Sequence, residues 1–232
     1  MDSLVSYKEV GSELTPLRNS VLLPTAKLDD QKFEFYFILD VSGSMYGRPW
    51  ELASRAISLF LQSLPADCYF NVITFDEEYT CIFPSSVKYS QETLEEAKQK
   101  IHGLFTGGYT EDFIKVLNYV LSCPQIPGYL TQIFSLTDAE LTSEPEDTVK
   151  LYDAHSKRFR SFCLGIGDRV DQNMVKRIAG GNTGMYDYVR TNEFMESKVL
   201  NLLKLSLKPA LLKPIRVTSH SRLIHMLEPA HA

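Results

Sequence analysis

Residues 33–44 read FEFYFILDVSGS, an apolar and aromatic run that stops abruptly at a cluster of polar residues. The nearly continuous apolarity of residues 33–39 is typical of a strand that helices cover on both faces. Asp40 follows this strand directly, and Ser42 and Ser44 flank Gly43. Because glycine permits a tight turn, the carboxylate and both hydroxyls can point toward one place. The stretch therefore predicts a central buried strand with oxygen donors at its carboxyl end.

Strands and helices alternate along the rest of the chain. The apolar patterns predict further strands at 69–75, 79–83, 129–136, 159–166 and 185–189. They predict helices at 48–64, 90–105, 112–122, 145–156, 171–179 and 193–207. The short acidic link 76–78 favours an antiparallel pairing of the strands on either side of it. We expect an α/β fold of the Rossmann-like kind: a doubly wound, mostly parallel sheet with one antiparallel edge strand and helices on both faces.

Length and composition indicate one large domain with extensions. The chain has 232 residues, of which 44% are hydrophobic and 23% charged, and these proportions exclude a mainly disordered chain. The strand and helix pattern occupies residues 31–207, which we take as the domain. Residues 1–30 and 208–232 do not join this pattern and are interpreted as an N-terminal and a C-terminal extension.

The charge balance argues against nucleic acid as a partner. Lys and Arg number 24 against 29 Asp and Glu, a net charge of −5, so the chain as a whole repels phosphate backbones. Residues 197–227 nevertheless contain six cations and no acid. We interpret them as the solvated side of the last helix and of the segment after it. The alternative is an electropositive surface for an acidic protein or membrane lipid.

Targeting signals and cysteines point to an intracellular, cytoplasmic protein. No stretch approaches 18 consecutive apolar residues, and the first residues do not resemble a secretory signal, so we expect no membrane partner. The four cysteines form no CxxC pair, and we expect all four to be reduced and buried. They are Cys68, Cys81, Cys123 and Cys163.

Three polar segments stand where a parallel sheet binds ligands, beyond the carboxyl ends of its strands. They are residues 40–44, residues 107–111 and the pair Thr137-Asp138. Each supplies oxygen donors and none supplies an imidazole or a thiolate. Such a set suits Mg²⁺ or Mn²⁺ better than Zn²⁺.

These segments resemble the three parts of the metal-ion-dependent adhesion site (MIDAS) of von Willebrand factor type A (VWA) domains. The matching stretches are FILDVSGSM at 37–45, GGYTE at 107–111 and SLTD at 135–138, and the likeness extends over residues 33–207. Other runs resemble the intracellular branch of the family in which an inter-alpha-trypsin-inhibitor-type (VIT) domain precedes the A domain; they lie at 63–65, 68–72, 83–89 and 162–167. A complete VIT domain does not fit into residues 1–30, so we expect none in this chain.

The resemblance implies a cation-dependent protein–protein interaction module without catalysis. It implies that Ser42, Ser44 and Thr110 ligate the cation, while Asp40 and Asp138 hold coordinating waters. The implied cation is Mg²⁺, or Mn²⁺ or Ca²⁺. Carboxylates that bind only through water would leave the cation an open position, which an Asp or Glu of a protein partner can fill.

Two departures from the family pattern leave other interpretations open. Tyr109 is inserted before Thr110, and Ala139 follows Asp138 where glycine is usual. The insertion could displace Thr110, leaving Glu111 or Asp112 as the ligand, or weaken the site so far that the domain is a structural scaffold. Ala139 should be tolerated unless its loop needs a positive φ.

A Mg²⁺-dependent hydrolase with Asp40 as nucleophile is the enzymatic alternative. Such an enzyme uses a second acid two residues later, where this chain has Ser42. A hydroxyl cannot serve as the acid or base near neutral pH, so this interpretation is disfavoured.

Overall fold

The computed structural model describes residues 31–108, 113–140, 145–155, 158–180 and 185–208. The expected N-terminal extension, and all but the first residue of the expected C-terminal extension, lie outside these ranges. No helix in the described ranges is long and apolar enough to cross a membrane.

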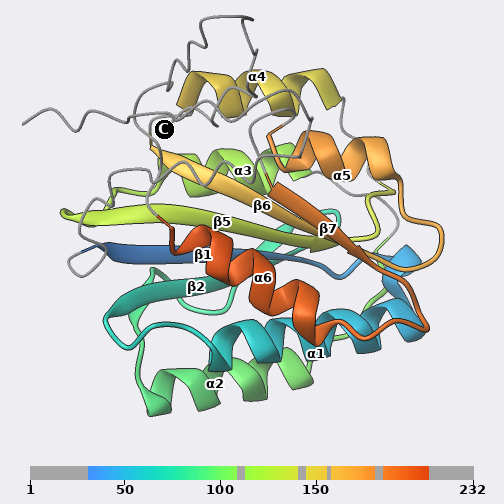
Figure 1. Cartoon of the computed structure of the whole chain (residues 1–232), viewed down its shortest axis with the longest axis horizontal. Coiled ribbons are helices and arrows are strands. Elements are labelled where there is room, and N and C mark those ends of the chain that lie inside the picture. The colour runs from blue at the N-terminus through green and yellow to red at the C-terminus, as the bar shows by residue number, and fades with distance from the viewer. Residues whose placement is uncertain (1–30, 109–112, 141–144, 156–157, 181–184, 209–232) are drawn as a thin grey trace, which may run out of the picture.

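The strands form one sheet, in the order β3-β2-β1-β5-β6-β7 (Figure 1). Their bounds are β1 Lys32–Asp40, β2 Cys68–Phe75, β3 Tyr79–Cys81, β5 Tyr129–Thr137, β6 Phe159–Ile166 and β7 Met185–Val189. All neighbours are parallel except at the outer side of β2, which pairs antiparallel with β3 and with the two-residue β4, Val87–Lys88. The predicted mostly parallel sheet with an antiparallel edge is confirmed, and β4 extends that same edge.

Helices cover both faces of the sheet, as the sequence predicts (Figure 1). On one face lie α1 (Arg48–Gln62), α2 (Gln91–His102) and α6 (Glu196–Ser206). On the other lie α3 (Phe113–Ser122), α4 (Pro145–His155) and α5 (Gln172–Ile178). The ends of α2 have local causes: Ser90 accepts a hydrogen bond from the N–H of Thr93, and Gly103 follows the last turn.

Strict alternation along β1 builds both halves of the core. Phe35 and Phe37 point toward α1, α2 and α6, whereas Tyr36 and Ile38 point toward α3, α4 and α5. Phe134 of β5 lies at the middle of the first half. Its ring centroid is 4.7 Å from that of Phe162, 5.0 Å from that of Phe60 and 5.4 Å from that of Phe37. These packed rings fix β1 and β5 side by side, and so fix the positions at which the two strands end.

The cysteines are free, but the expectation that all four are buried is wrong for two of them. Cys68 and Cys163 are buried in the sheet, whereas Cys81 and Cys123 are half-buried. Cys81 ends the short edge strand β3, which has an open side, and Cys123 lies just past the end of α3. Apolar neighbours in sequence therefore do not suffice to predict burial at the edge of a sheet.

Candidate metal centre

The polar segments meet at the point where the strand order of the sheet reverses. From β1 the chain passes to β2 on one side, and it returns through α2 and α3 to β5 on the other side. Asp40 ends β1 and Thr137 ends β5, so the two loops leave adjacent strand ends in different directions (Figure 1). Such a reversal is the usual ligand site of an open α/β sheet.

Asp40 is completely buried, and both of its carboxylate oxygens accept hydrogen bonds. The backbone N–H of Ser42 donates to Oδ1 at 3.0 Å, and the hydroxyl of Thr137 donates to Oδ2 at 2.5 Å. The Thr137 oxygen also accepts from the N–H of Ala139 at 2.8 Å. Thr137 thus connects the loop after β1 to the loop after β5, a role that its place in the sequence does not reveal.

Ser42, Ser44 and Asp138 complete a cluster of four oxygen-bearing side chains with Asp40. The Ser42 and Ser44 hydroxyl oxygens are 3.0 Å apart, and the Ser44 hydroxyl is close enough to the Asp138 carboxyl group to lower its pKa. A 3₁₀ turn over Gly43–Met45 brings both serines to the same side. The structure therefore brings together four of the five predicted site residues.

The charges of this cluster are not balanced by neighbouring cations. No Lys, Arg or His in the described ranges forms an ion pair with Asp40 or Asp138. Burial raises the pKa of Asp40 to about 6, although hydrogen bonds from Thr137 and Ser42 act in the opposite direction. Burial also raises the pKa of Asp138, against the hydrogen bond from Ser44. Both carboxyl groups are thus held in surroundings that disfavour their negative charge.

The third predicted segment is only partly described, but its beginning lies beside Ser42. Gly108 forms a parallel bridge with Ser42, and its carbonyl accepts from the N–H of Gly43 at 2.9 Å. The predicted ligand Thr110 lies outside the described residues, as do Tyr109, Glu111 and Asp112. Gly108, two residues before Thr110, is therefore the last described residue of this segment, and it lies next to the loop that carries Ser42 and Ser44.

Glycine is required at position 108 for a reason the sequence did not reveal. A Cβ added to Gly108 would lie 2.5 Å from the Cβ of Asp76, too close for a real side chain. Asp76 directly follows β2, so this contact packs the loop after β2 against the loop that leads to Thr110. The acidic residues at the end of β2 were the signal available, and they were interpreted only as a turn.

Ala139 has a positive φ of 63°, and it is the only non-glycine residue with positive φ in the described ranges. The condition under which alanine would be tolerated, a loop without positive φ, is therefore not met. This conformation costs a residue with a Cβ about 1–2 kcal/mol, which explains why glycine suits the position. The hydrogen bond from its N–H to Thr137 helps to hold the strained turn in place.

The donors in the cluster are two carboxylates and two hydroxyls. Within the described part of the chain, no three or more His, Cys, Asp or Glu side chains are arranged so that they alone could hold a metal ion. A site of this kind is unlike a zinc site built from thiolates and imidazoles, and its oxygens suit a hard cation.

Comparison with known proteins identifies the family. A sequence profile described as the von Willebrand factor type A domain matches residues 34–188. The chain belongs to this family. Rat von Willebrand factor A domain-containing protein 5A is 35% identical over 188 residues, which are 77% of this chain. The matched region spans only 23% of that relative's length.

Two solved structures share the fold of this chain at low sequence identity. The manganese-loaded TRAP protein of Plasmodium vivax matches with a TM-score of 0.61 and 17% identity, over 77% of this chain and 74% of that one. Proximal thread matrix protein 1 from the mussel byssus, with a zinc-occupied MIDAS motif, matches with a TM-score of 0.61 and 15% identity, over 77% of this chain and 46% of that one. These likenesses confirm the VWA fold of this chain.

Proposed function

We propose that this VWA domain is a divalent-cation-dependent protein–protein interaction module. The observation that carries the proposal is the convergence of Asp40, Ser42, Ser44 and Asp138 at the reversal point of the sheet, with no cationic side chain of the described ranges paired to the two acids. Thr110 is proposed as the third direct ligand, together with Ser42 and Ser44, because Gly108 runs beside Ser42. The partner contributes an Asp or Glu.

The residues present fit a hard divalent cation. All donors are oxygens, and the raised pKa values of Asp40 and Asp138 reflect negative charge that a cation would stabilise. Mg²⁺ is the expected cation, with Mn²⁺ or Ca²⁺ as alternatives. When bound, it would supply positive charge and an open position for a carboxylate. The Mn²⁺ and Zn²⁺ named for the TRAP protein and for proximal thread matrix protein 1 belong to those proteins, and they support a divalent-cation site here.

The buried position of Asp40 speaks against the hydrolase alternative. A nucleophile must reach its substrate, but Asp40 has no exposed surface and both of its oxygens are engaged by Ser42 and Thr137. We therefore propose a binding module without catalysis. The remaining alternative is a structural scaffold whose site is weakened by the Tyr109 insertion.

Calorimetric titration of Mg²⁺ into chelator-treated protein distinguishes a cation-dependent binding module from a structural scaffold. We expect saturable binding of one cation per chain, lost in a Ser42→Ala/Ser44→Ala double variant. Ser122→Ala is the matched control, because the Ser122 hydroxyl is exposed and donates to the carbonyl of Tyr119 on its own helix. Absence of Mg²⁺ binding by the folded wild-type protein would favour the scaffold.

The carboxylate part of the proposal has its own probe. Acetate is a minimal stand-in for an acidic side chain, and its binding can be followed by chemical-shift changes at the loops after β1 and β5. We expect these changes in Mg²⁺ and not in chelator. Equal acetate effects in both conditions would count against an open position on the cation.

A further inference from the structure

The most exposed apolar side chains in the described ranges are three aromatic rings. Tyr46 is 79% exposed, Phe105 90% and Phe194 88%. The next most exposed large apolar side chain in these ranges is Leu200, at 45%. Single exposed apolar residues are normal in soluble proteins, so their exposure alone indicates nothing. Their location is the informative point.

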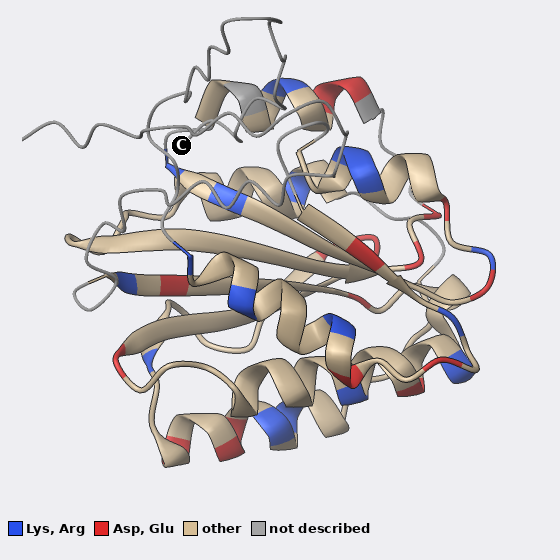
Figure 2. Ribbon diagram, in the orientation of Figure 1, with Lys and Arg blue, Asp and Glu red and all other residues tan. Residues whose placement is uncertain are grey.

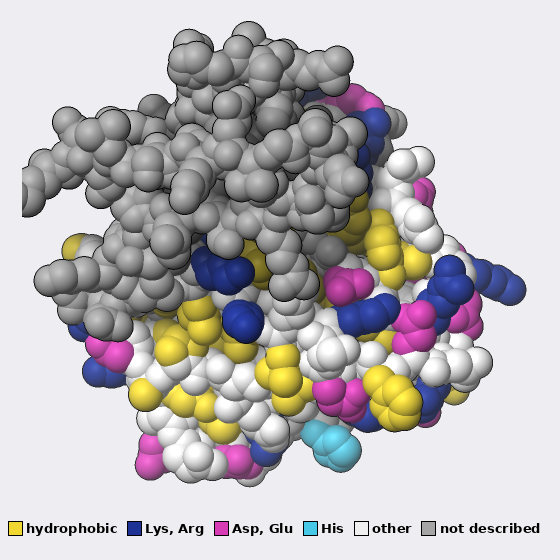
Figure 3. All heavy atoms as spheres, in the orientation of Figure 1, with side chains coloured by type: hydrophobic (Ala, Val, Ile, Leu, Met, Phe, Trp, Pro, Cys, Tyr) yellow, Lys and Arg dark blue, Asp and Glu magenta, His cyan; other side chains and the backbone are white. Residues whose placement is uncertain are grey.

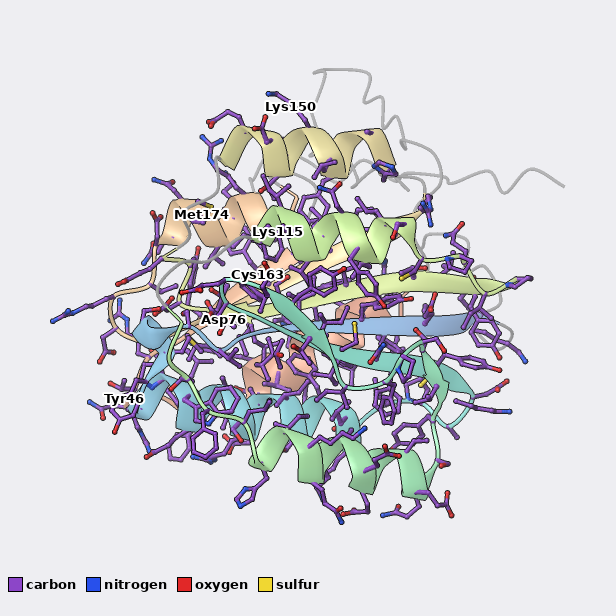
Figure 4. All side chains as sticks on the ribbon, turned by 180° about the vertical axis from the view of Figure 1, so that it is seen from behind. Tyr46, Asp76, Lys115, Lys150, Cys163 and Met174 are labelled. Carbon is purple, nitrogen blue, oxygen red and sulfur yellow. The ribbon has the colours of Figure 1, made fainter. Side chains whose placement is uncertain are left out.

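All three rings stand on loops at the carboxyl end of the sheet, the end that carries the candidate metal centre. Tyr46 follows the 3₁₀ turn that contains Ser44, and Phe105 lies two residues before Gly107, whose N–H donates to the carbonyl of Val41. Phe194 lies between β7 and α6, in the loop that leaves the carboxyl end of β7. Figure 4 shows Tyr46 at the same end of the sheet as Asp76.

Elsewhere the described surface offers no comparable set. On the face seen in Figure 3, the apolar side chains form small separate groups between charged ones. The buried neighbour of Tyr46 makes the contrast clear. Met45 is completely buried, while Tyr46 points into solvent. The rings of Tyr46, Phe105 and Phe194, here called the aromatic rim, therefore contribute little to the core.

The charges around the candidate metal centre differ between its two flanks. On the β2 flank, Asp76, Glu77 and Glu78 follow one another, and Lys115 pairs with Glu78 at 3.6 Å. On the β6 and β7 flank, acids are interspersed with cations: Arg169 follows Asp168 in sequence, and Lys198 pairs with Glu193 at 2.6 Å. Figure 2 shows acidic and basic residues interspersed on the loops at this end. The β2 flank thus keeps an excess of negative charge that would repel further acids of a partner.

We propose that the occupant of this face is a peptide segment with one Asp or Glu between apolar side chains, and with Lys or Arg on the side that meets Asp76–Glu78. The inference rests on the proposed function, because the single carboxylate is the group that the cation would take. The aromatic rim buries the apolar neighbours of that carboxylate. The acidic β2 flank selects the cationic neighbour and rejects polyacidic stretches.

The test begins with Mg²⁺ calorimetry and then uses a randomised peptide library with one fixed Asp. Peptides are selected on the immobilised wild-type domain in Mg²⁺ and eluted with chelator. We expect Leu, Phe or Trp beside the fixed Asp and Lys or Arg on one side only. Replacing the apolar neighbours of a selected peptide by Ser should weaken its binding by about tenfold or more, the scale expected for a ring-sized apolar contact.

Variants of the domain test whether the aromatic rim causes the preference for apolar neighbours of the fixed Asp. In a Tyr46→Ser/Phe105→Ser/Phe194→Ser variant, the apolar and Ser versions of the peptide should bind alike, while Mg²⁺ affinity stays that of the wild type. Leu200→Ser is the control and should keep the full discrimination. Glu77→Gln/Glu78→Gln should remove the preference for Lys or Arg. Phe105→Ser alone, at the most exposed ring, gives the same test with the least risk to folding.

The outcomes separate this inference from the proposed function. If Mg²⁺ binds but the selected peptides are polyacidic, or none elutes with chelator, the inference is wrong and the metal site stands. Unchanged discrimination in the rim variants would also overturn it. If the wild-type domain does not bind Mg²⁺, the proposed function and the inference fall together.

Discussion

Replacing Asp40 by Asn should stabilise the metal-free domain while abolishing its cation binding. Asp40 is fully buried without a cationic partner in the described ranges, and burial raises its pKa from 3.8 to about 6. This rise in the pKa of Asp40 corresponds to about 3 kcal/mol by which burial disfavours the ionised side chain at pH 7. Asn has the same shape and no charge, so it removes this cost.

Part of the stabilisation expected from Asp40→Asn is lost because the hydrogen bond with Thr137 is disturbed. The N–H of Ser42 can still donate to the amide oxygen of the substituted side chain, but the amide nitrogen would face the Thr137 hydroxyl, which must then turn from donor to acceptor. A disturbed hydrogen bond costs about 1 kcal/mol. We therefore expect a net stabilisation of about 1–2 kcal/mol for Asp40→Asn at pH 7 in chelator, measured by urea unfolding followed by circular dichroism.

Excess Mg²⁺ should reverse the order of stability of the wild type and Asp40→Asn. A cation that binds only the native wild type adds about 2.7 kcal/mol at a concentration of about one hundred times Kd, and it adds nothing to a variant without the site. The wild type should thus be the less stable protein in chelator and the more stable one in excess Mg²⁺.

The pH dependence follows from the same pKa with a definite sign. Because the folded-state pKa of Asp40 is raised, the native state takes up its proton as the pH falls through about 6, before the unfolded chain does. Acidification from about pH 7 to about pH 5 should therefore stabilise the metal-free wild type relative to Asp40→Asn by about 1 kcal/mol.

Asp67→Asn is the control for this experiment. Asp67 is half-exposed and pairs with Lys32 at 2.7 Å, and the hydrogen bond from Lys32 lowers the pKa of Asp67; because solvent screens this pair, its removal should change the stability little. Two results together would refute the reasoning: an Asp40→Asn protein clearly less stable than the wild type in chelator, and a stability gap between the two that is the same at both pH values.

Further changes probe the turn, the core and the thiols. Ala139→Gly should leave the free energy of unfolding within about 0.5 kcal/mol of that of the wild type, because relief of the positive φ offsets the lost methyl group and the added chain entropy. The control Ala53→Gly, inside α1, should cost about 2 kcal/mol. Equal costs of the two substitutions in thermal unfolding would contradict the strain at Ala139. Phe134→Ala removes the ring that packs against four others and should cost about 3–5 kcal/mol in urea unfolding; a loss under about 1 kcal/mol would contradict the packing described. Cys68 and Cys163 should react with a thiol reagent only after unfolding, since burial raises the pKa of both thiols, that of Cys68 to about 12. The half-buried Cys81 and Cys123 should react first. Equal reaction rates of all four cysteines in the native protein would contradict this prediction.

The fold could be predicted well because its signals are local and agree with one another. The apolar run that ends at Asp40 can only be buried between two helix layers, and the alternation of strands and helices leaves few topologies. The strands and helices lie within a few residues of their predicted bounds, as β6 at Phe159–Ile166 illustrates. Errors occur at the edge of the sheet, where Cys81 is half-buried because a three-residue edge strand leaves one side open.

The sequence predicted the oxygen-bearing side chains of the candidate metal centre, but not the residues that hold them in place. Ser42 and Ser44 share one short loop, so their convergence could be predicted from a single segment. Thr137 and Asp76 act on residues far away in sequence, through a hydrogen bond to Asp40 and a close contact with Gly108. Such contacts depend on which strand ends are neighbours, and the sequence pattern does not specify the strand order.

The most direct test of the metal centre counts bound cations. Free Mn²⁺ gives an electron paramagnetic resonance signal that bound Mn²⁺ loses, so titrating Mn²⁺ into metal-free protein measures both stoichiometry and affinity. We predict one Mn²⁺ per chain, displaced by Mg²⁺ and absent in Asp40→Asn. A folded wild-type domain that leaves the free Mn²⁺ signal undiminished would contradict the claim that Asp40, Ser42, Ser44 and Asp138 form a metal centre.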